Sequence, residues 1–272
     1  MRVLVVGSGA VATVLVQAWR AAGLVVEQRS SRLPWTDTDA FDAVMICVAD
    51  RAIAEVARSA VAAGAAASGT ALLHGAGALP PSEVFADVRE RVGGVALCHP
   101  LLAMADGEAG RLAGATLAVA GDPTGRAVAL RLAESAGGRA IVLDEQGLSR
   151  YHAAAAMVAN HALALAAAGE ALLCSLGIAR DDAARALGKL IMSSAENWVR
   201  LGLPAALTGP IARGDCAIVA RHLASLPPTL NDLYRMTGRA LLDLARAKGQ
   251  APAAALDEVE ALLADSPAKQ EG

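Results

Sequence analysis

The first half of the chain alternates short apolar runs with segments of helical periodicity. The run 43–48 (AVMICV) is apolar throughout, which is typical of a strand buried on both faces of a parallel sheet. With right-handed crossovers, this alternation predicts a doubly wound α/β sheet. The predicted strands are 1–6, 24–28, 43–48, 70–73, 95–98, 116–119 and 140–143, and the predicted helices between them are 11–22, 51–63 and 124–136.

The second half of the chain shows only helical periodicity. We place the domain boundary near residue 147, which predicts domains at 1–147 and 148–264. The polar stretch 265–272 is expected to be a disordered tail. The predicted helices of this half are 151–176, 181–202, 215–225, 229–248 and 253–264.

A glycine-rich turn follows the first predicted strand. Gly7 permits the turn, Gly9 lets the backbone approach a pyrophosphate, and Ala12 lets the next helix pack closely on the strand. The free N–H groups and positive dipole end of that helix favour phosphate. This context predicts a Rossmann-type dinucleotide-binding domain, followed by an all-α domain. The residues expected to contact the cofactor here are Gly7, Ser8, Gly9, Ala10 and Val11.

The end of the second predicted strand indicates which dinucleotide binds. NAD-binding domains place an acidic residue there, and NADP-binding domains an arginine. Glu27 lies within the strand, where alternation can turn it away, whereas Arg29 and Arg32 flank two hydroxyls and suit a 2′-phosphate. A solvated basic loop is the alternative interpretation. We expect NADP(H) as the cofactor, held here by Arg29, Ser30, Ser31 and Arg32.

Further candidates fall at the carboxyl ends of predicted strands, where an open α/β sheet forms its ligand crevice. Val48, Ala49 and His74 are expected to line the cofactor site at this edge. His99 is the stronger candidate for catalysis, because Pro100 stiffens the backbone beside it. For either histidine, the alternative role is to hold a loop by a hydrogen bond.

The alanine-rich first helix of the second half carries His152 and Asn160. Their separation corresponds to about 80° around a helix and two turns along it, so both can border one cleft. An imidazole and an amide there could bind and protonate a carbonyl or imine group. The alternatives are an ordinary exposed histidine and a core amide.

The loop 207–215 combines glycine and proline with Arg213 and Asp215. A lone arginine in a tight loop is costly to hold without an anionic partner, so Arg213 is expected to bind a substrate carboxylate. Asp215 is better suited to capping the following helix. His222, inside that helix, is assigned no chemistry.

Composition excludes several classes of function. The 272 residues are 55% hydrophobic but only 3% aromatic, and a net charge of −3 offers no basic field for nucleic acid. The four cysteines lack metal-ligand spacing, so we expect no metal site, and they suit free thiols in the cytoplasm. The apolar segment 153–173 is interrupted by His161 and Glu170 and suits a buried helix better than a membrane span.

The chain resembles a bacterial family of Rossmann-like proteins that carry a C-terminal domain of unknown function. The resemblance extends to about residue 245 and rests on motifs at 7–9, 44–50, 74–77, 99–100, 151–155, 160 and 208–215. Family members are often described as NADP- or deazaflavin-dependent oxidoreductases. The resemblance implies a homodimer, a helical second domain and the 6-phosphogluconate-dehydrogenase-like superfamily.

More distant relatives bear on the mechanism. Ketopantoate reductase and the β-hydroxyacid dehydrogenases place a lysine and an asparagine four residues apart on the first helix of the second domain. If Asn160 matches that asparagine, Ala156 stands where the lysine would be, and His152 is the candidate replacement. The pair His99-Pro100 resembles the His-Pro of prephenate dehydrogenases, whose histidine contacts substrate.

These interpretations predict an oxidoreductase that transfers hydride between NADP(H) and a small oxo- or imino-acid in an interdomain cleft. Arg213 and Asn160 would hold the substrate, and His152 or His99 would donate the proton. The absent lysine also motivates an alternative, a regulatory protein that binds NADP(H) without turnover. A second alternative is an enzyme that reduces NADP with a deazaflavin.

Overall fold

The computed structural model describes residues 1–36, 38–105 and 112–264, so the predicted tail at 265–272 lies outside the described residues. The chain divides into two compact units, Met1–His161 and Ala162–Gly272. Among the described residues, the last strand ends at Val142, close to the predicted domain boundary, whereas the units divide further along the chain. The boundary near residue 147 stays a prediction.

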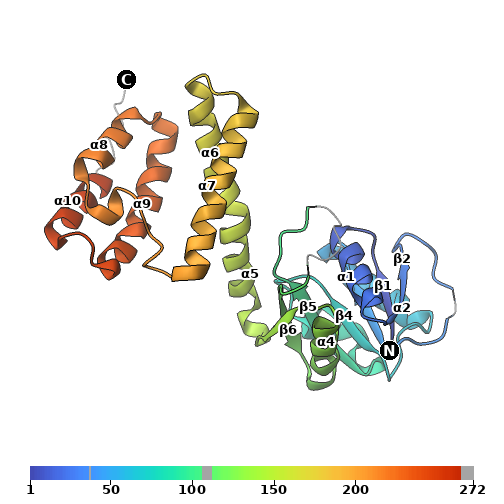
Figure 1. Cartoon of the computed structure of the whole chain (residues 1–272). Coiled ribbons are helices and arrows are strands. Elements are labelled where there is room, and N and C mark those ends of the chain that lie inside the picture. The colour runs from blue at the N-terminus through green and yellow to red at the C-terminus, as the bar shows by residue number, and fades with distance from the viewer. Residues whose placement is uncertain (37, 106–111, 265–272) are drawn as a thin grey trace, which may run out of the picture. The chain divides into compact units, whose positions relative to one another are not determined.

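The first unit is built on one seven-stranded sheet with the order β2-β1-β3-β4-β5-β6-β7, of which β1, β2, β4, β5 and β6 are labelled in Figure 1. The strands β1 to β5 are parallel, and β6 runs antiparallel to β5. Because β1 to β5 are parallel, their carboxyl ends share one edge, as predicted. The strands are Arg2–Val6 (β1), Val25–Arg29 (β2), Ala43–Ile46 (β3), Ala71–His74 (β4), Gly94–Pro100 (β5), Thr116–Gly121 (β6) and Arg139–Val142 (β7).

Helices cover both faces of this sheet, which makes the fold doubly wound. Alternate strand residues point to opposite faces, so Val3 and Val5 pack with the α1 and α4 side, while Leu4 and Val6 pack with the α2 side. The helices of this unit are α1 (Ala10–Ala21), η1 (Asp50–Ala52), α2 (Ile53–Ala62), α3 (Pro81–Val84), η2 (Ala86–Arg91), α4 (Pro123–Ser135), η3 (Glu145–Gly147), α5 (Leu148–Ala156) and the π-helical segment η4 (Met157–His161).

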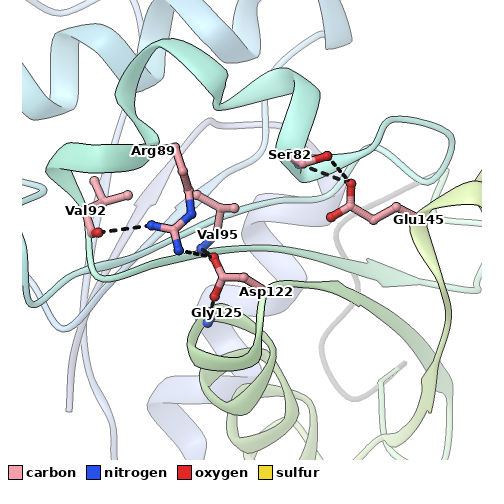
Figure 2. Close-up of polar contacts among 7 residues, drawn as sticks. All are labelled: Ser82, Arg89, Val92, Val95, Asp122, Gly125 and Glu145. Atoms are coloured by element: carbon pink, nitrogen blue, oxygen red, sulfur yellow. Dashed lines mark hydrogen bonds and ion pairs between the residues drawn. The ribbon is translucent and has the colours of Figure 1, made fainter.

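Two clusters of polar contacts link helices and strands of this unit to the segments that connect them (Figure 2). Asp122 accepts hydrogen bonds from the backbone N–H groups of Gly125, at the start of α4, and Val95, and forms an ion pair with Arg89 at 3.0 Å. Glu145 accepts hydrogen bonds from Ser82, through its hydroxyl and through its backbone N–H at 3.3 Å. This second cluster ties the segment before α5 to the start of α3, which helps to fix where α5 begins.

The second unit is helical, as predicted, and the described residues beyond 142 contain no strand. Its aliphatic core, which includes Val219, Leu242 and Val259, is formed by α8, α9, α10 and η5. Within the described residues, α6 buries no side chain and α7 buries only Ala183. The helices are α6 (Ala162–Ser175), α7 (Arg180–Leu201), η5 (Ile211–Arg213), α8 (Cys216–Ser225), α9 (Pro228–Lys248) and α10 (Ala253–Ala264).

In the region predicted as one helix, 151–176, the structure differs from the prediction in two ways. The π-helical segment η4 interrupts it, and its side chains are largely exposed within the single chain rather than buried. The helical stretch Glu145–Ser175 is the one stretch of the described chain that is long and apolar enough to cross a membrane, with a mean hydropathy of 1.4. One such helix is weak evidence for a membrane span, because core helices of soluble proteins meet the same criterion.

Candidate functional site

The turn after β1 requires glycine at its first position. Gly7 has φ +144°, and a Cβ there would lie 2.1 Å from the carbonyl oxygen of Cys47. The Gly7 N–H donates to the carbonyl oxygen of Arg29 at 2.9 Å, which joins the ends of β1 and β2. The close approach of two backbones, rather than a tight turn alone, therefore excludes any larger residue.

The start of α1 is open to a ligand. Gly9 occupies the N-cap, and among the described residues no side chain caps the helix. A Cβ at Gly9 would meet no described atom within 4 Å. The first N–H groups and the positive end of the helix dipole thus face free space, which is the arrangement that binds phosphate.

A cavity of about 790 Å³ extends from this helix start along the carboxyl edge of the sheet. Its predicted lining residues come from the ends of β1, β2 and β3. These are Gly7, Ser8, Gly9, Ala10, Val11, Ser30, Ser31, Arg32, Val48 and Ala49. The residues Gly75 and Ala76, which follow β4, extend the lining in the direction of β5.

Arg29 does not line this cavity, and the prediction that it cradles a 2′-phosphate does not fit its geometry. Its guanidinium donates to the carbonyl oxygens of Leu33 and Pro34, each at 2.9 Å, and stacks 3.8 Å from the centre of the Trp35 ring. The side chain is therefore engaged in shaping the loop after β2. Arg32, three residues later, supplies the arginine that lines the cavity.

His74 is also absent from the lining, because its side chain is completely buried. Its Nδ1 accepts a hydrogen bond from the backbone N–H of Ala76 at 3.2 Å, and its ring lies against Phe85. Burial, with a smaller contribution from His99, lowers the pKa of His74 to about 3, so this histidine is neutral at physiological pH. It holds the Gly75–Ala76 turn rather than contacting a ligand itself.

Sequence reasoning missed several residues that line the cavity, including Asp50, Arg51 and Met104. Asp50 and Arg51 begin η1, directly after the end of β3. The rule that ligands bind at the carboxyl ends of strands could have identified them, since Val48 and Ala49 were chosen on that ground. Met104 lies in a loop after β5 and carried no comparable signal.

His99 forms a cluster with the start of α5. Its Nδ1 lies 2.8 Å from the Tyr151 hydroxyl, and its ring centroid lies 6.0 Å from that of His152. A Cβ built on Gly77 would lie 3.0 Å from both Cε1 and Nε2 of His99 and 2.8 Å from Cδ2 of His152. The edges of both histidine rings therefore meet beside Gly77, one residue beyond the cavity-lining Ala76.

The surroundings of this cluster favour neutral side chains. Burial, and next the charge of His152, lower the pKa of His99 to about 4, although Asp50 opposes this effect. Burial, and next Cys98, raise the pKa of Tyr151 to about 12. At physiological pH both groups are uncharged, so His99 can form hydrogen bonds there but is not an acid that gives up a proton.

The other predicted substrate residues belong to later elements of the chain. Asn160 is exposed in the π-helical segment at the end of the first unit, and Arg213 is exposed in η5 of the second unit. Asp215 caps α8 by accepting the backbone N–H of Ile218 at 3.1 Å, as expected. His222 pairs with the Tyr234 hydroxyl at 2.8 Å inside the second unit. Among the described residues no group of three His, Cys, Asp or Glu side chains could hold a metal ion.

Comparisons with known proteins agree with this architecture. The model of a family described as a domain of unknown function (DUF2520) matches residues 115–241, and no curated protein matches the chain. A Bacteroides fragilis protein, provisionally described as an NADP oxidoreductase, superimposes with a TM-score of 0.70 at 19% identity, covering 88% of this chain and 97% of that one.

Two further solved structures share the fold. A protein from Thermotoga maritima gives a TM-score of 0.69 at 19% identity, covering 91% of this chain and 99% of that one. A Plasmodium falciparum pyrroline carboxylate reductase with NADP bound gives 0.55 at 12% identity, covering 96% and 99%. At these identities the similarity is one of fold: this chain has an α/β domain of Rossmann type followed by a helical region.

Proposed function

We propose that this protein is an NADP(H)-dependent oxidoreductase that acts on a small oxo- or imino-acid. The observation that carries the proposal is the uncapped start of α1, which opens into a cavity lined by Ser30, Ser31 and Arg32 at the end of β2. Free N–H groups suit the pyrophosphate, and an arginine with two hydroxyls suits a 2′-phosphate.

The strand order indicates how the cofactor would lie. Adenosine would be next to β2, the phosphates next to β1, and the nicotinamide toward Gly75 and Ala76 beyond β4. When bound, NADPH supplies the hydride. His99 and His152 would then lie at the nicotinamide end of the cavity, on the side of β5.

The substrate class rests on Arg213 and Asn160, which offer a guanidinium and an amide for a carboxylate. The resemblance to structures described as an NADP oxidoreductase and as an NADP-bound pyrroline carboxylate reductase supports the same class of reaction. We expect Arg213→Ala to raise the KM for the acid substrate strongly while leaving the Kd of NADPH nearly unchanged. An equal loss of both affinities would contradict its role in substrate binding.

Parallel fluorescence titrations with NADPH and NADH test the cofactor assignment. We expect NADPH to bind at least tenfold more tightly, a difference of about 1.4 kcal/mol, and Arg32→Ala to remove most of this preference. Arg131→Ala is the matched control, because Arg131 is an exposed arginine of α4 that does not line the cavity. If neither nucleotide bound, the oxidoreductase proposal would be wrong.

Turnover separates the enzyme from its alternatives. Oxidation of NADPH by an oxo- or imino-acid supports the reductase, whereas tight binding without oxidation by any such acid favours a regulatory nucleotide-binding protein. This second interpretation is motivated by Ala156, which would stand at the lysine position of the ketopantoate reductases if Asn160 matches their asparagine. Rapid NADP reduction by a reduced deazaflavin, without an acid substrate, would select the third possibility.

We also propose a homodimer that covers the exposed apolar side chains of α6 and α7. Leu163 is 69% exposed, Leu190 60% and Val199 87%, and large apolar side chains that recur along neighbouring helices are normally buried. Light scattering during gel filtration should give twice the chain mass. We expect Val199→Glu combined with Leu190→Glu to produce monomers, whereas Arg200→Glu, a change of an exposed polar residue on the same helix, should not.

A further inference from the structure

The pair formed by His99 and Tyr151 has a chemical consequence for the proposed reaction. We propose that Tyr151 is a positioning residue, whose hydroxyl donates a hydrogen bond to Nδ1 of His99. This hydrogen bond keeps the proton of the neutral ring on Nε2, the nitrogen that lies beside Gly77. There, Nε2–H donates a hydrogen bond to the carbonyl oxygen or imine nitrogen of the substrate. This inference rests on the proposed reductase function and names the group that polarises its substrate.

The geometry of the pair is well determined by the elements that carry it. His99 lies near the end of β5, two residues after Leu97 and hence on the same face of the sheet. Tyr151 lies one turn after Leu148 on α5 and packs on the same small apolar cluster as Leu97. The two rings meet edge to face, with centroids 5.7 Å apart and planes at 86°. Both side chains are partly buried, which restricts the rotation of the two rings around the 2.8 Å contact.

The direction of this hydrogen bond follows from the chemistry of the two groups. A phenol is a strong O–H donor, whereas its oxygen accepts weakly, and the unprotonated nitrogen of an imidazole is a strong acceptor. Burial raises the pKa of Tyr151, so the hydroxyl keeps its proton. Tyr151 therefore donates and Nδ1 of His99 accepts, which leaves the single proton of the neutral ring on Nε2.

The protonated edge lies against Gly77, which carries no side chain. A Cβ on Gly77 would lie 3.0 Å from Nε2 of His99 and 2.8 Å from Cδ2 of His152, so any side chain at 77 would intrude between the two rings. Gly77 follows Ala76, which lines the cavity at the end where the nicotinamide is proposed to lie. A substrate carbonyl or imine at this point could reach both His99 and the proposed hydride donor.

The proton balance assigns different tasks to the two histidines. When hydride adds to the substrate carbon, the electron pair of the C=O or C=N bond moves to oxygen or nitrogen and takes up one proton. His99 is already neutral at physiological pH, so losing a further proton would leave an imidazolate. His99 therefore polarises the bond and keeps its proton, and the transferred proton comes from another donor, such as the neighbouring His152 or a water molecule. This narrows the earlier expectation that His99 could be the proton donor.

Nuclear magnetic resonance of the full-length protein tests the tautomer without any substrate. In protein labelled with ¹⁵N-histidine, we expect His99 to show a protonated Nε2 and an unprotonated Nδ1 near pH 7, assigned by loss of its signals in His99→Gln. Tyr151→Phe should shift the Nδ1 resonance and mix the two tautomers. A wild-type His99 protonated on Nδ1, or one whose ring shifts ignore Tyr151→Phe, would overturn the proposal.

The chain offers a matched control, because His222 and Tyr234 form a second pair at the same 2.8 Å distance. Tyr234→Phe should alter the ring signals of His222 and leave those of His99 unchanged. Titration of His99 in both variants must take account of the charged and titratable groups around it, which are Tyr151, His152, Asp50 and His74.

Kinetics then test the link to the reaction. With an oxo- or imino-acid that oxidises NADPH, we expect Tyr151→Phe to lower kcat at least tenfold while the Kd of NADPH stays within twofold, and Tyr234→Phe to leave both unchanged. Equal kcat values in wild type and Tyr151→Phe would overturn the positioning role. Absence of turnover in the wild type would instead contradict the reductase function, even if the tautomer were found as described.

Discussion

The two histidine–tyrosine pairs of this protein are nearly identical in local geometry and differ in their surroundings. Both have a nitrogen–oxygen distance of 2.8 Å, and both meet edge to face, at 5.7 Å and 86° for His99–Tyr151 and 5.8 Å and 87° for His222–Tyr234. The first pair lies beside Gly77, His152 and the end of the cavity. The second joins α8 to α9 beside an aliphatic core.

This difference shows that a hydrogen-bonded pair does not by itself make a site. The ring edge of His99 lies beside a glycine and a second histidine, and burial lowers the pKa of His99 to about 4. The Tyr234 hydroxyl has its pKa raised by burial, but its pair joins two helices of one unit. We therefore assign chemistry to the first pair and a structural role to the second. The predictions below test that division.

The largest effect on binding and stability should come from Gly7→Ala. This change alters the lining of the cavity and leaves the His222–Tyr234 pair unchanged. The added Cβ would lie 2.1 Å from the carbonyl oxygen of Cys47, at a φ of +144° that other residues rarely adopt. We expect NADPH binding to fall at least a hundredfold and the free energy of unfolding to drop by about 3 kcal/mol or more. Fluorescence titration and urea unfolding would measure the two effects.

Gly9→Ala is the comparison variant, because a Cβ at Gly9 meets no described atom within 4 Å. It should leave the stability nearly unchanged and weaken only nucleotide binding. The ring signals of His222 should be unaffected in both variants. Loss of stability in Gly9→Ala equal to that in Gly7→Ala would contradict this account of the turn.

Acid should destabilise the protein through His74 and His99. Burial is the main cause of their low pKa values, about 3 and about 4, against 6.5 for an unperturbed histidine. Between about pH 6.5 and 4 the unfolded chain binds protons that the folded chain does not. The stability from these neutral histidines is therefore complete above pH 6.5 and declines as pH falls, by up to about 1.4 kcal/mol per pH unit for each histidine.

Urea unfolding at a series of pH values measures this slope. We expect His74→Asn to reduce the slope, because it removes the histidine that is completely buried. His161→Asn, a change of an exposed histidine, is the control and should leave the slope unchanged. A slope of the same size in His74→Asn and the wild type would show that other groups cause the acid sensitivity.

The smallest effect should come from Tyr234→Phe, which removes one hydrogen bond from the second pair. We expect the free energy of unfolding to fall by about 1 kcal/mol, with NADPH binding and turnover unchanged. Differential scanning calorimetry and the fluorescence titration would measure these quantities. A loss of activity in Tyr234→Phe as large as in Tyr151→Phe would remove the distinction between the two pairs.

The sequence predicted the order and type of the long elements well, because their periodicity reports burial directly. The continuous apolar run near 43–48 contains β3, whose four residues are all buried, and the predicted helix 253–264 has the same bounds as α10. It predicted no helix between 73 and 95, where α3 and η2 lie, since these are short and have little periodicity. It also did not predict that β6 runs antiparallel to β5.

For the candidate site, some residues were placed correctly from the sequence and others were not. Local motifs were sufficient for the glycine turn and for the capping role of Asp215, because both depend on neighbours within a few residues. Arg29 and Arg32 are equivalent in the sequence, and only the loop conformation directs the first toward Trp35 and the second to the cavity. His74 is completely buried and holds the turn that follows β4. Its place at the end of a strand does not reveal this burial.

By itself, the sequence determined an α/β half with a glycine turn after its first strand and a helical half, because these follow from local periodicity and from the backbone freedom of glycine. Only the tertiary structure decided which polar side chains act together. His99 and Tyr151 are 52 residues apart in sequence and belong to a strand and a helix, respectively. Their contact, the pKa values it accompanies and the position of the His99 ring edge against Gly77 depend on the packing of distant segments, which local patterns do not encode.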